Sequence, residues 1–215
     1  MNDLPEFLKL PVILASYTAD VVGKRNLLSS FFTSVSQSRQ SFASLRGELS
    51  GWTDDDLFAF PFDESRRALY AKKEASKATY EDSAGALVLI AAASLERLSR
   101  ALGQMIVDRG APSYIPGIHF ARAVWELANQ YKHLGEWRHD PKPKRAQSTM
   151  QVVALLVDDP LRSDAAAEFL NRAGLDRYAD FEAALLSCID GLSSASLVPG
   201  GSDGITSVTL VAVDE

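Results

Sequence analysis

Apolar residues recur every three or four positions over most of this chain, which is the spacing of one face of an α-helix. The clearest case is the segment 83–109, where leucine, isoleucine and methionine mark one face and alanine fills the centre. The alanines predict neighbours packed closely on more than one side, and Gly110 is placed as a stop. Asp63 is placed to cap a helix that runs to about Tyr80. Similar spacing predicts further helices at 8–22, 24–49, 118–134, 163–173 and 175–192, the first of them starting near Pro11.

Two segments have strand-like patterns instead. Residues 148–157 form an apolar, β-branched run of strand length, and residues 205–213 alternate between apolar and polar side chains. The two segments could pair as a small C-terminal ribbon. We therefore expect a mainly all-α protein, a helical bundle that forms a single domain over 1–215. Its helical body would span about 8–192, with 148–157 and 205–213 as a two-stranded appendage.

Composition narrows the class of protein. Hydrophobic residues make up 47% of the chain and charged residues 23%, as in globular domains. No apolar stretch approaches the ~20 residues that cross a bilayer, so we expect no membrane association, and the N-terminus lacks the basic start of a signal peptide. Cys188 is the only cysteine, which excludes an internal disulfide and favours a cytoplasmic setting. The net charge of −6 argues against a protein that coats nucleic acid non-specifically, but it is compatible with a local basic patch.

The helix predicted at 118–134 has a polar edge opposite its apolar face. At about 100° per residue, four hydrogen-bonding side chains share this edge, and two tryptophans lie near it. One interpretation is a solvent-facing stripe with an i, i+4 ion pair. The tryptophans favour a different interpretation, in which another helix or subunit covers part of the edge. The four polar residues are Arg122, Glu126, Asn129 and His133, and the tryptophans are Trp125 and Trp137.

Three residues at the end of this helix contain the minimum chemistry for metal-independent RNA cleavage, in which the ribose 2′-OH attacks its own phosphate. An imidazole such as that of His133 can accept and return a proton near neutral pH. Lys132 can contact the phosphate, and Asn129 can position the substrate or the imidazole. Further contacts with the RNA backbone are expected from nearby basic residues. These are Arg122, Arg138, His139, Lys142, Lys144 and Arg145.

The segment A-N-Q-Y-K-H at 128–133 resembles the motif of the HEPN superfamily. The upstream sequence SLERL, with Glu96, resembles that family's acidic position within an Ala/Leu-rich helix. HEPN domains are helical and belong to bacterial or phage defence and toxin–antitoxin systems. The resemblance covers roughly residues 80–140 and implies a metal-independent endoribonuclease. Its site would form across a homodimer of the 83–109 and 118–134 helices, with an antitoxin or nucleotidyltransferase as a protein partner.

Ala128 departs from this pattern, because the family motif has an arginine there. Phosphate contacts would then fall to Lys132, Arg122 or the basic residues after the helix, and members without the full motif act as binding or regulatory modules. The second hypothesis is therefore a non-catalytic interaction module, with Trp125 and Trp137 as interface anchors. Neither hypothesis involves a metal or a cofactor, and the three histidines lack metal-ligand spacing.

Overall fold

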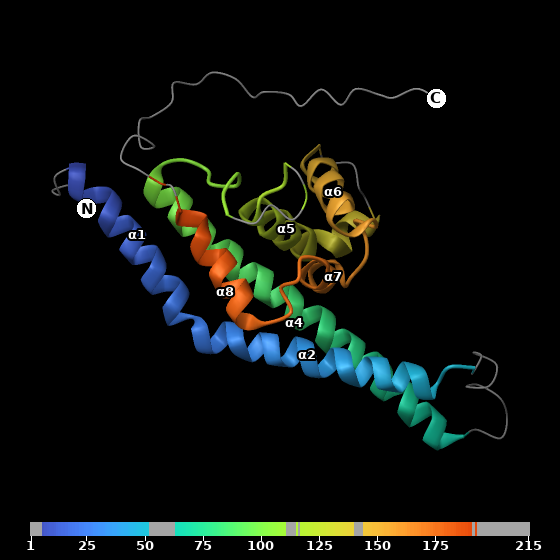
Figure 1. The fold of residues 1–215 in the computed structure, drawn as a ribbon. Coiled ribbons are helices and arrows are strands. Elements are labelled where there is room, and N and C mark those ends of the chain that lie inside the picture. Colours follow the sequence, from blue (N-terminus) through green and yellow to red (C-terminus); the bar gives the residue numbers. More distant parts are fainter. Residues whose placement is uncertain are drawn as a thin grey trace.

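The chain is mainly α-helical in the computed structural model, which describes residues 6–51, 63–110, 115, 117–139, 144–190 and 192. Its helices form a bundle from which one pair projects, and the described residues include no β-strand element (Figure 1). In chain order the elements are α1 (Glu6–Gly23), α2 (Arg25–Glu48), α4 (Glu64–Leu102), α5 (Phe120–His139), α6 (Lys144–Val157), α7 (Ala165–Arg172), α8 (Tyr178–Leu186) and a short 3-10 helix, η1 (Ser187–Ile189).

The longest helix is α4, and α2 runs beside it (Figure 1). It has 39 residues, a length of about 58 Å at the usual ~1.5 Å rise per residue. Asp63 caps its start as predicted, since its side chain accepts a hydrogen bond from the Arg66 backbone N–H at 3.1 Å. The separate helices predicted over 63–80 and 83–109 are wrong: one helix covers both and ends at Gly103, which has φ of 68°. A single glycine, Gly85, does not interrupt it because that residue is buried against α5.

Serine pairs join α2 to α4. The Ser34 and Ser83 hydroxyls are hydrogen-bonded at 2.8 Å, and those of Ser41 and Ser76 at 3.0 Å. Serine lowers the intrinsic helix propensity of α2. In this fold the small serine side chains let the two helices approach closely, and each hydroxyl finds a hydrogen-bond partner on the other helix.

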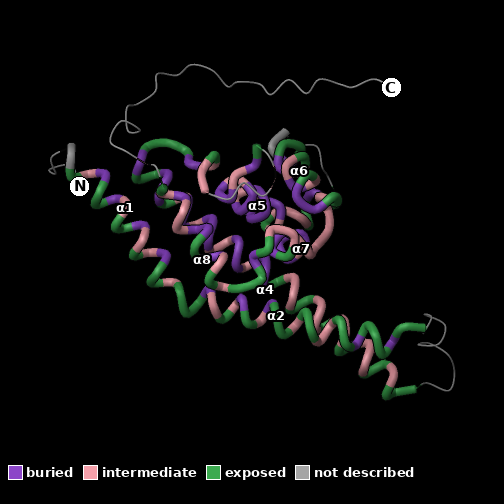
Figure 2. Tube along the Cα trace, in the orientation of Figure 1, coloured by how far each residue is buried: buried purple, intermediate pink, exposed green. Residues whose placement is uncertain are grey.

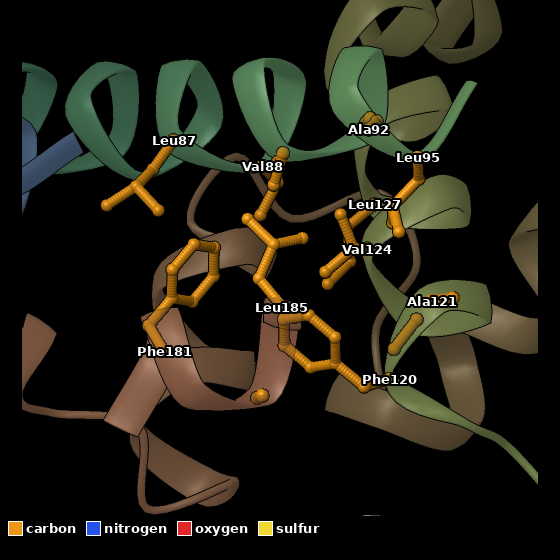
Figure 3. Packing of buried hydrophobic residues seen from close by; sticks show 14 of the residues in the cluster. Leu87, Val88, Ala92, Leu95, Phe120, Ala121, Val124, Leu127, Phe181 and Leu185 are labelled. Atoms are coloured by element: carbon orange, nitrogen blue, oxygen red, sulfur yellow. The ribbon is translucent and has the colours of Figure 1, made fainter. Parts of the chain in front are cut away.

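α5 lies at the centre of the body, in contact with α4, α6, α7 and α8. Figure 3 shows Val124 and Leu127 of α5 pointing towards Val88 of α4, with Leu185 of α8 closing the cluster. α5 continues past its predicted end at 134, through Gly135, because the Trp137 side chain is buried against the body at 7% exposure.

The strand predicted at 148–157 is wrong, because these residues belong to α6. The described buried residues of α6 are Ala146, Thr149, Val153, Leu156 and Val157, and the first four recur at spacings of three, four and three, as on one face of a helix. A short apolar run does not by itself distinguish a strand from a buried helix, and the β-branched residues in this run favoured a strand. The second predicted strand, 205–213, lies outside the described residues.

The remaining helices match their predicted places with shifted ends. α1 begins before its predicted start and includes Pro11. The predictions at 163–173 and 175–192 correspond to the shorter α7 and to α8 with η1. None of the described helices is long and apolar enough to cross a membrane.

Candidate functional site

A groove of about 610 Å³ opens between α5 and α6, and we call it the α5–α6 groove. Three of the four residues of the predicted polar edge line it, Glu126, Asn129 and His133, together with both tryptophans, whereas Arg122 is not among its lining residues. α6 covers part of this edge, which agrees with the interpretation that another helix shields it. The lining residues are Trp125, Glu126, Asn129, His133, Glu136 and Trp137 from α5, Ala146, Ser148 and Thr149 from α6, and Met105 from the segment after α4.

Glu126 is the buried acidic residue of the groove, at 7% exposure. Its Oε2 accepts a hydrogen bond from the Thr149 hydroxyl at 2.7 Å, and its Oε1 lies 2.8 Å from Arg122 Nε. A buried carboxylate is tolerated only when it is paired and hydrogen-bonded. Arg122 therefore serves as an internal partner of Glu126, which limits its use as a phosphate contact.

His133 stands at the open end of the groove with its side chain 46% exposed. Its ring stacks on Trp137, with ring centroids 5.7 Å apart and an interplanar angle of 20°. The Nδ1 atom lies 3.1 Å from Glu136 Oε2. The Trp137 indole and the Glu136 carboxylate together restrict the orientation of the imidazole, which lines the groove.

Lys132 lines a different pocket, of about 150 Å³, between α4 and α5. Glu96, the acidic residue of the SLERL segment, lines the same pocket, and so does Ala128. Asn129 and Trp125 belong to both this pocket and the α5–α6 groove. Of the predicted catalytic trio, the structure therefore brings Asn129 and His133 together and places Lys132 on the other side of Asn129.

The predicted basic contacts are spread out. The Arg138 guanidinium donates to the Leu161 backbone oxygen from Nε at 3.3 Å and Nη2 at 2.9 Å, which turns it towards the α6–α7 connection. His139 is exposed at the last position of α5. Lys142 lies outside the described residues, and Lys144 is the first residue of α6, with no description of its side chain.

The ion pair predicted between Arg122 and Glu126 is present, but the burial of Glu126 and the α6 wall of the groove were not predicted. Ser148 and Thr149 were assigned to a strand, so nothing placed them opposite α5. The helical spacing of Thr149, Val153 and Leu156 was the available signal. Met105, 57% exposed at the mouth of the groove, was assigned to the core face of a longer helix.

The charge of the α5–α6 groove is acidic. Glu126 and Glu136 line it, whereas its described lining includes no lysine or arginine. The described residues also contain no group of three or more His, Cys, Asp or Glu side chains that could hold a metal ion. No known protein family, curated protein or solved structure matches this chain.

Proposed function

We propose that this protein is a non-catalytic binding module, HEPN-like in its α4–α5 region, which takes a basic segment of a protein partner into the α5–α6 groove. The observation that carries the proposal is the acidic lining of the groove that holds His133. The single cysteine favours a cytoplasmic setting, and the resemblance implies a bacterial or phage defence or toxin–antitoxin system. An antitoxin or a nucleotidyltransferase is the class of partner expected there.

Electrostatics disfavours a phosphate in the groove and supports the binding module. A phosphodiester beside His133 would meet Glu136 and the buried carboxylate of Glu126, and like charges at such range repel more strongly where solvent is partly excluded. The cation that the cleavage chemistry requires, Lys132, opens into the smaller pocket next to Glu96. The arginine of the family motif, which would supply a second cation, is replaced by Ala128.

The same groove suits a lysine or arginine side chain. Indole faces attract cations, and Trp125 is half-buried at the groove wall. The carboxylate of Glu136, with its side chain 76% exposed, can pair with an incoming cation without breaking the Glu126 network. Met105 offers apolar contact for the stem of the same side chain.

The direct test uses a short blocked peptide of alternating glycine and arginine, and the same peptide with glutamate in place of arginine. The indole N–H resonances of Trp125 and Trp137 report on binding. We expect the arginine peptide to shift them in a saturable way and the glutamate peptide to leave them unchanged. Glu136→Gln should weaken binding by roughly two- to fivefold, the weight of one partly solvated ion pair. Glu74→Gln, at a carboxylate on α4 whose side chain is 44% exposed, is the matched control and should bind as the wild type does.

RNA cleavage is tested separately with the wild type and His133→Ala on a mixed RNA pool in EDTA. We expect both proteins to leave the RNA intact. Cleavage by the wild type that is lost in His133→Ala would overturn the proposal and establish the ribonuclease.

One observation favours that second candidate. Asn129 lines both the groove of His133 and the pocket of Lys132. In a homodimer through α4 and α5, as the resemblance implies, Lys132 of one copy could approach His133 of the other. Growth arrest on expression of the wild type, absent for both His133→Ala and Lys132→Ala, would support this candidate over the binding module.

A further inference from the structure

Exposed apolar side chains concentrate at the N-terminal end of the protein. Among the described residues, six large hydrophobic side chains remain exposed. Leu8, Val12 and Val22 lie on α1, and Leu27 follows at the start of α2. Monomeric proteins seldom leave such a group together on one element, and a contiguous patch of this kind marks an interaction surface.

These residues form a continuous stripe along α1. With exposed Ala15 and Ala19 they complete the series Leu8, Val12, Ala15, Ala19, Val22, whose spacing alternates between four and three. That is the seven-residue repeat of a helix seam that packs against another helix. We call this series the α1 stripe.

The stripe lies on the side of α1 that faces away from the body. The inner side of α1 buries Leu10, Ile13, Tyr17 and Val21, and the Tyr17 hydroxyl donates to the Leu185 backbone oxygen at 2.7 Å. Figure 2 shows exposed positions recurring along α1 at the edge of the protein. A helix that is apolar on both sides is typical of a helix buried on both sides.

The exposed positions of α1 carry no charge among its described side chains. Asp20 is turned towards α4, where it is bonded to Ser94 and Arg97. For a chain with a net charge of −6, an uncharged face is where two copies can meet with the least repulsion. A helix that lies on an anionic membrane would instead carry lysine and arginine along its polar edge.

We infer that α1 of a second copy covers the α1 stripe, and that the two helices pair in antiparallel orientation about a two-fold axis near Tyr17. The stripe is self-complementary in this arrangement, as a two-fold interface requires. Ala15 faces the partner's Ala19, and Val12 faces the partner's Val22. The alanines allow close approach at the centre, and the valines pack on either side of them. The stripe spans roughly 21 Å of helix, so the contact area is below that of a standard interface and the dimer is reversible at micromolar concentration.

Cysteine cross-linking of the full chain tests the arrangement. The native Cys188 is fully buried, so new cysteines report without interference. In the double variant Ala15→Cys/Ala19→Cys, the cysteine at 15 in each copy faces the cysteine at 19 in the other copy, which gives two pairs of thiols. We expect these pairs to form a covalent dimer under mild oxidation. The matched control Ser36→Cys/Gln40→Cys has the same spacing on exposed positions of α2 and should form no covalent dimer. Equal cross-linking of the control, or none by the α1 variant, overturns the inference.

Sedimentation equilibrium supplies the second measurement. Val12→Glu places a charge between the two α1 helices, so dimer affinity should fall at least about tenfold. The circular dichroism of the helices should stay unchanged. Ala93→Glu on the α4–α5 side should leave the dimer intact. A dimer that survives Val12→Glu but is lost in Ala93→Glu lies at α4 and α5 and overturns the inference. So does a monomeric wild type that sediments with vesicles of anionic phospholipid.

Discussion

The ring of Tyr131 occupies the space beside Gly85 that any larger residue would need. A Cβ atom at Gly85 would lie 2.1 Å from Tyr131 Cε2. The Tyr131 hydroxyl donates to Asp82 Oδ1 at 3.2 Å, and burial followed by the Asp82 charge raises the pKa of this phenol. α5 therefore docks on α4 at a position where only glycine fits.

Gly85→Ala is expected to destabilise the protein, although alanine is the better helix former. The clash with Tyr131 requires a shift of the packed ring or of α5, which costs ~1–3 kcal/mol and outweighs the gain of ~1 kcal/mol in helix propensity. Urea unfolding measures the difference. Gly47→Ala in α2, where nothing lies within 4 Å, is the control and should be neutral or stabilising. A Gly85→Ala protein as stable as that control would contradict the packing of Tyr131.

The Glu126 network gives a prediction that separates structure from function in the candidate site. Arg122→Ala leaves a nearly buried carboxylate without its cation and should cost about 1–3 kcal/mol in the free energy of unfolding. The double variant Arg122→Met/Glu126→Leu removes both charges and should recover most of that loss. Arg100→Ala breaks the exposed pair with Glu96 and should change stability by less than about 0.5 kcal/mol. If Arg122→Ala cost no more than Arg100→Ala, Arg122 would be available for a ligand.

Between helices, one carboxylate joins α1 to α4. Asp20 Oδ2 accepts hydrogen bonds from Lys24 Nζ at 2.6 Å and Ser94 Oγ at 2.7 Å, and Oδ1 accepts one from Arg97 at 2.5 Å. Burial opposes ionisation of Asp20, but these hydrogen bonds and the charges of Lys24 and Arg97 outweigh it. The pKa of the Asp20 carboxyl is consequently lower than its ordinary value.

This network makes part of the stability depend on pH. Because the pKa of Asp20 is lower in the folded chain than in the unfolded chain, its contribution is complete above about pH 5 and is lost as the pH falls through the folded value. Asp20→Asn should lower the free energy of unfolding at pH 7 by about 1 kcal/mol, after allowance for solvent screening. The difference between variant and wild type should shrink towards pH 3. Glu48→Gln, an exposed side chain at the end of α2, should show no such trend, and a constant effect of Asp20→Asn across this range would contradict the assignment.

The spacing of apolar residues predicts where helices lie but not where they end. The pattern along 83–109 continued past Gly103, yet the left-handed backbone there ends α4. The helix predicted to end at 134 continues through Gly135 to His139, because Trp137 is buried against the body. The first outcome is a local glycine cap that the apolar spacing does not show, and the second depends on packing between segments distant in the sequence.

The candidate site was predictable to the same extent. That Asn129 and His133 share one edge of a helix follows from their spacing of four. That Lys132, next to His133 in the chain, opens into another pocket depends on how α4 lies against α5. To predict that Thr149 lines the groove, one would have to know that 144–157 form a helix and where that helix crosses α5.

Across the protein as a whole, buried residues are unevenly distributed. The paired ends of α2 and α4 project from the body as an arm, formed by about residues 44–51 and 63–76 (Figure 1). Within these two ranges only Leu45 and Leu49 are buried, and Figure 2 shows mostly exposed and intermediate positions there. The central part of α4, from Ser83 to Leu102, instead contacts the main core.

This distribution predicts that the arm opens without unfolding the body. Leu45 and Leu95 are equally well buried, at 4% and 2% exposure, one in the arm and one in the core. Leu95→Ala should lower the global free energy of unfolding by about 3 kcal/mol and speed hydrogen exchange in the core part of α4, from Ser83 to Leu102, while the arm exchanges as in the wild type. Leu45→Ala should have a smaller global effect and speed exchange only in the arm, because local opening relieves the cavity there. Native-state hydrogen exchange of both variants measures this, and a uniform increase of exchange in Leu45→Ala would show that arm and body unfold as one cooperative unit.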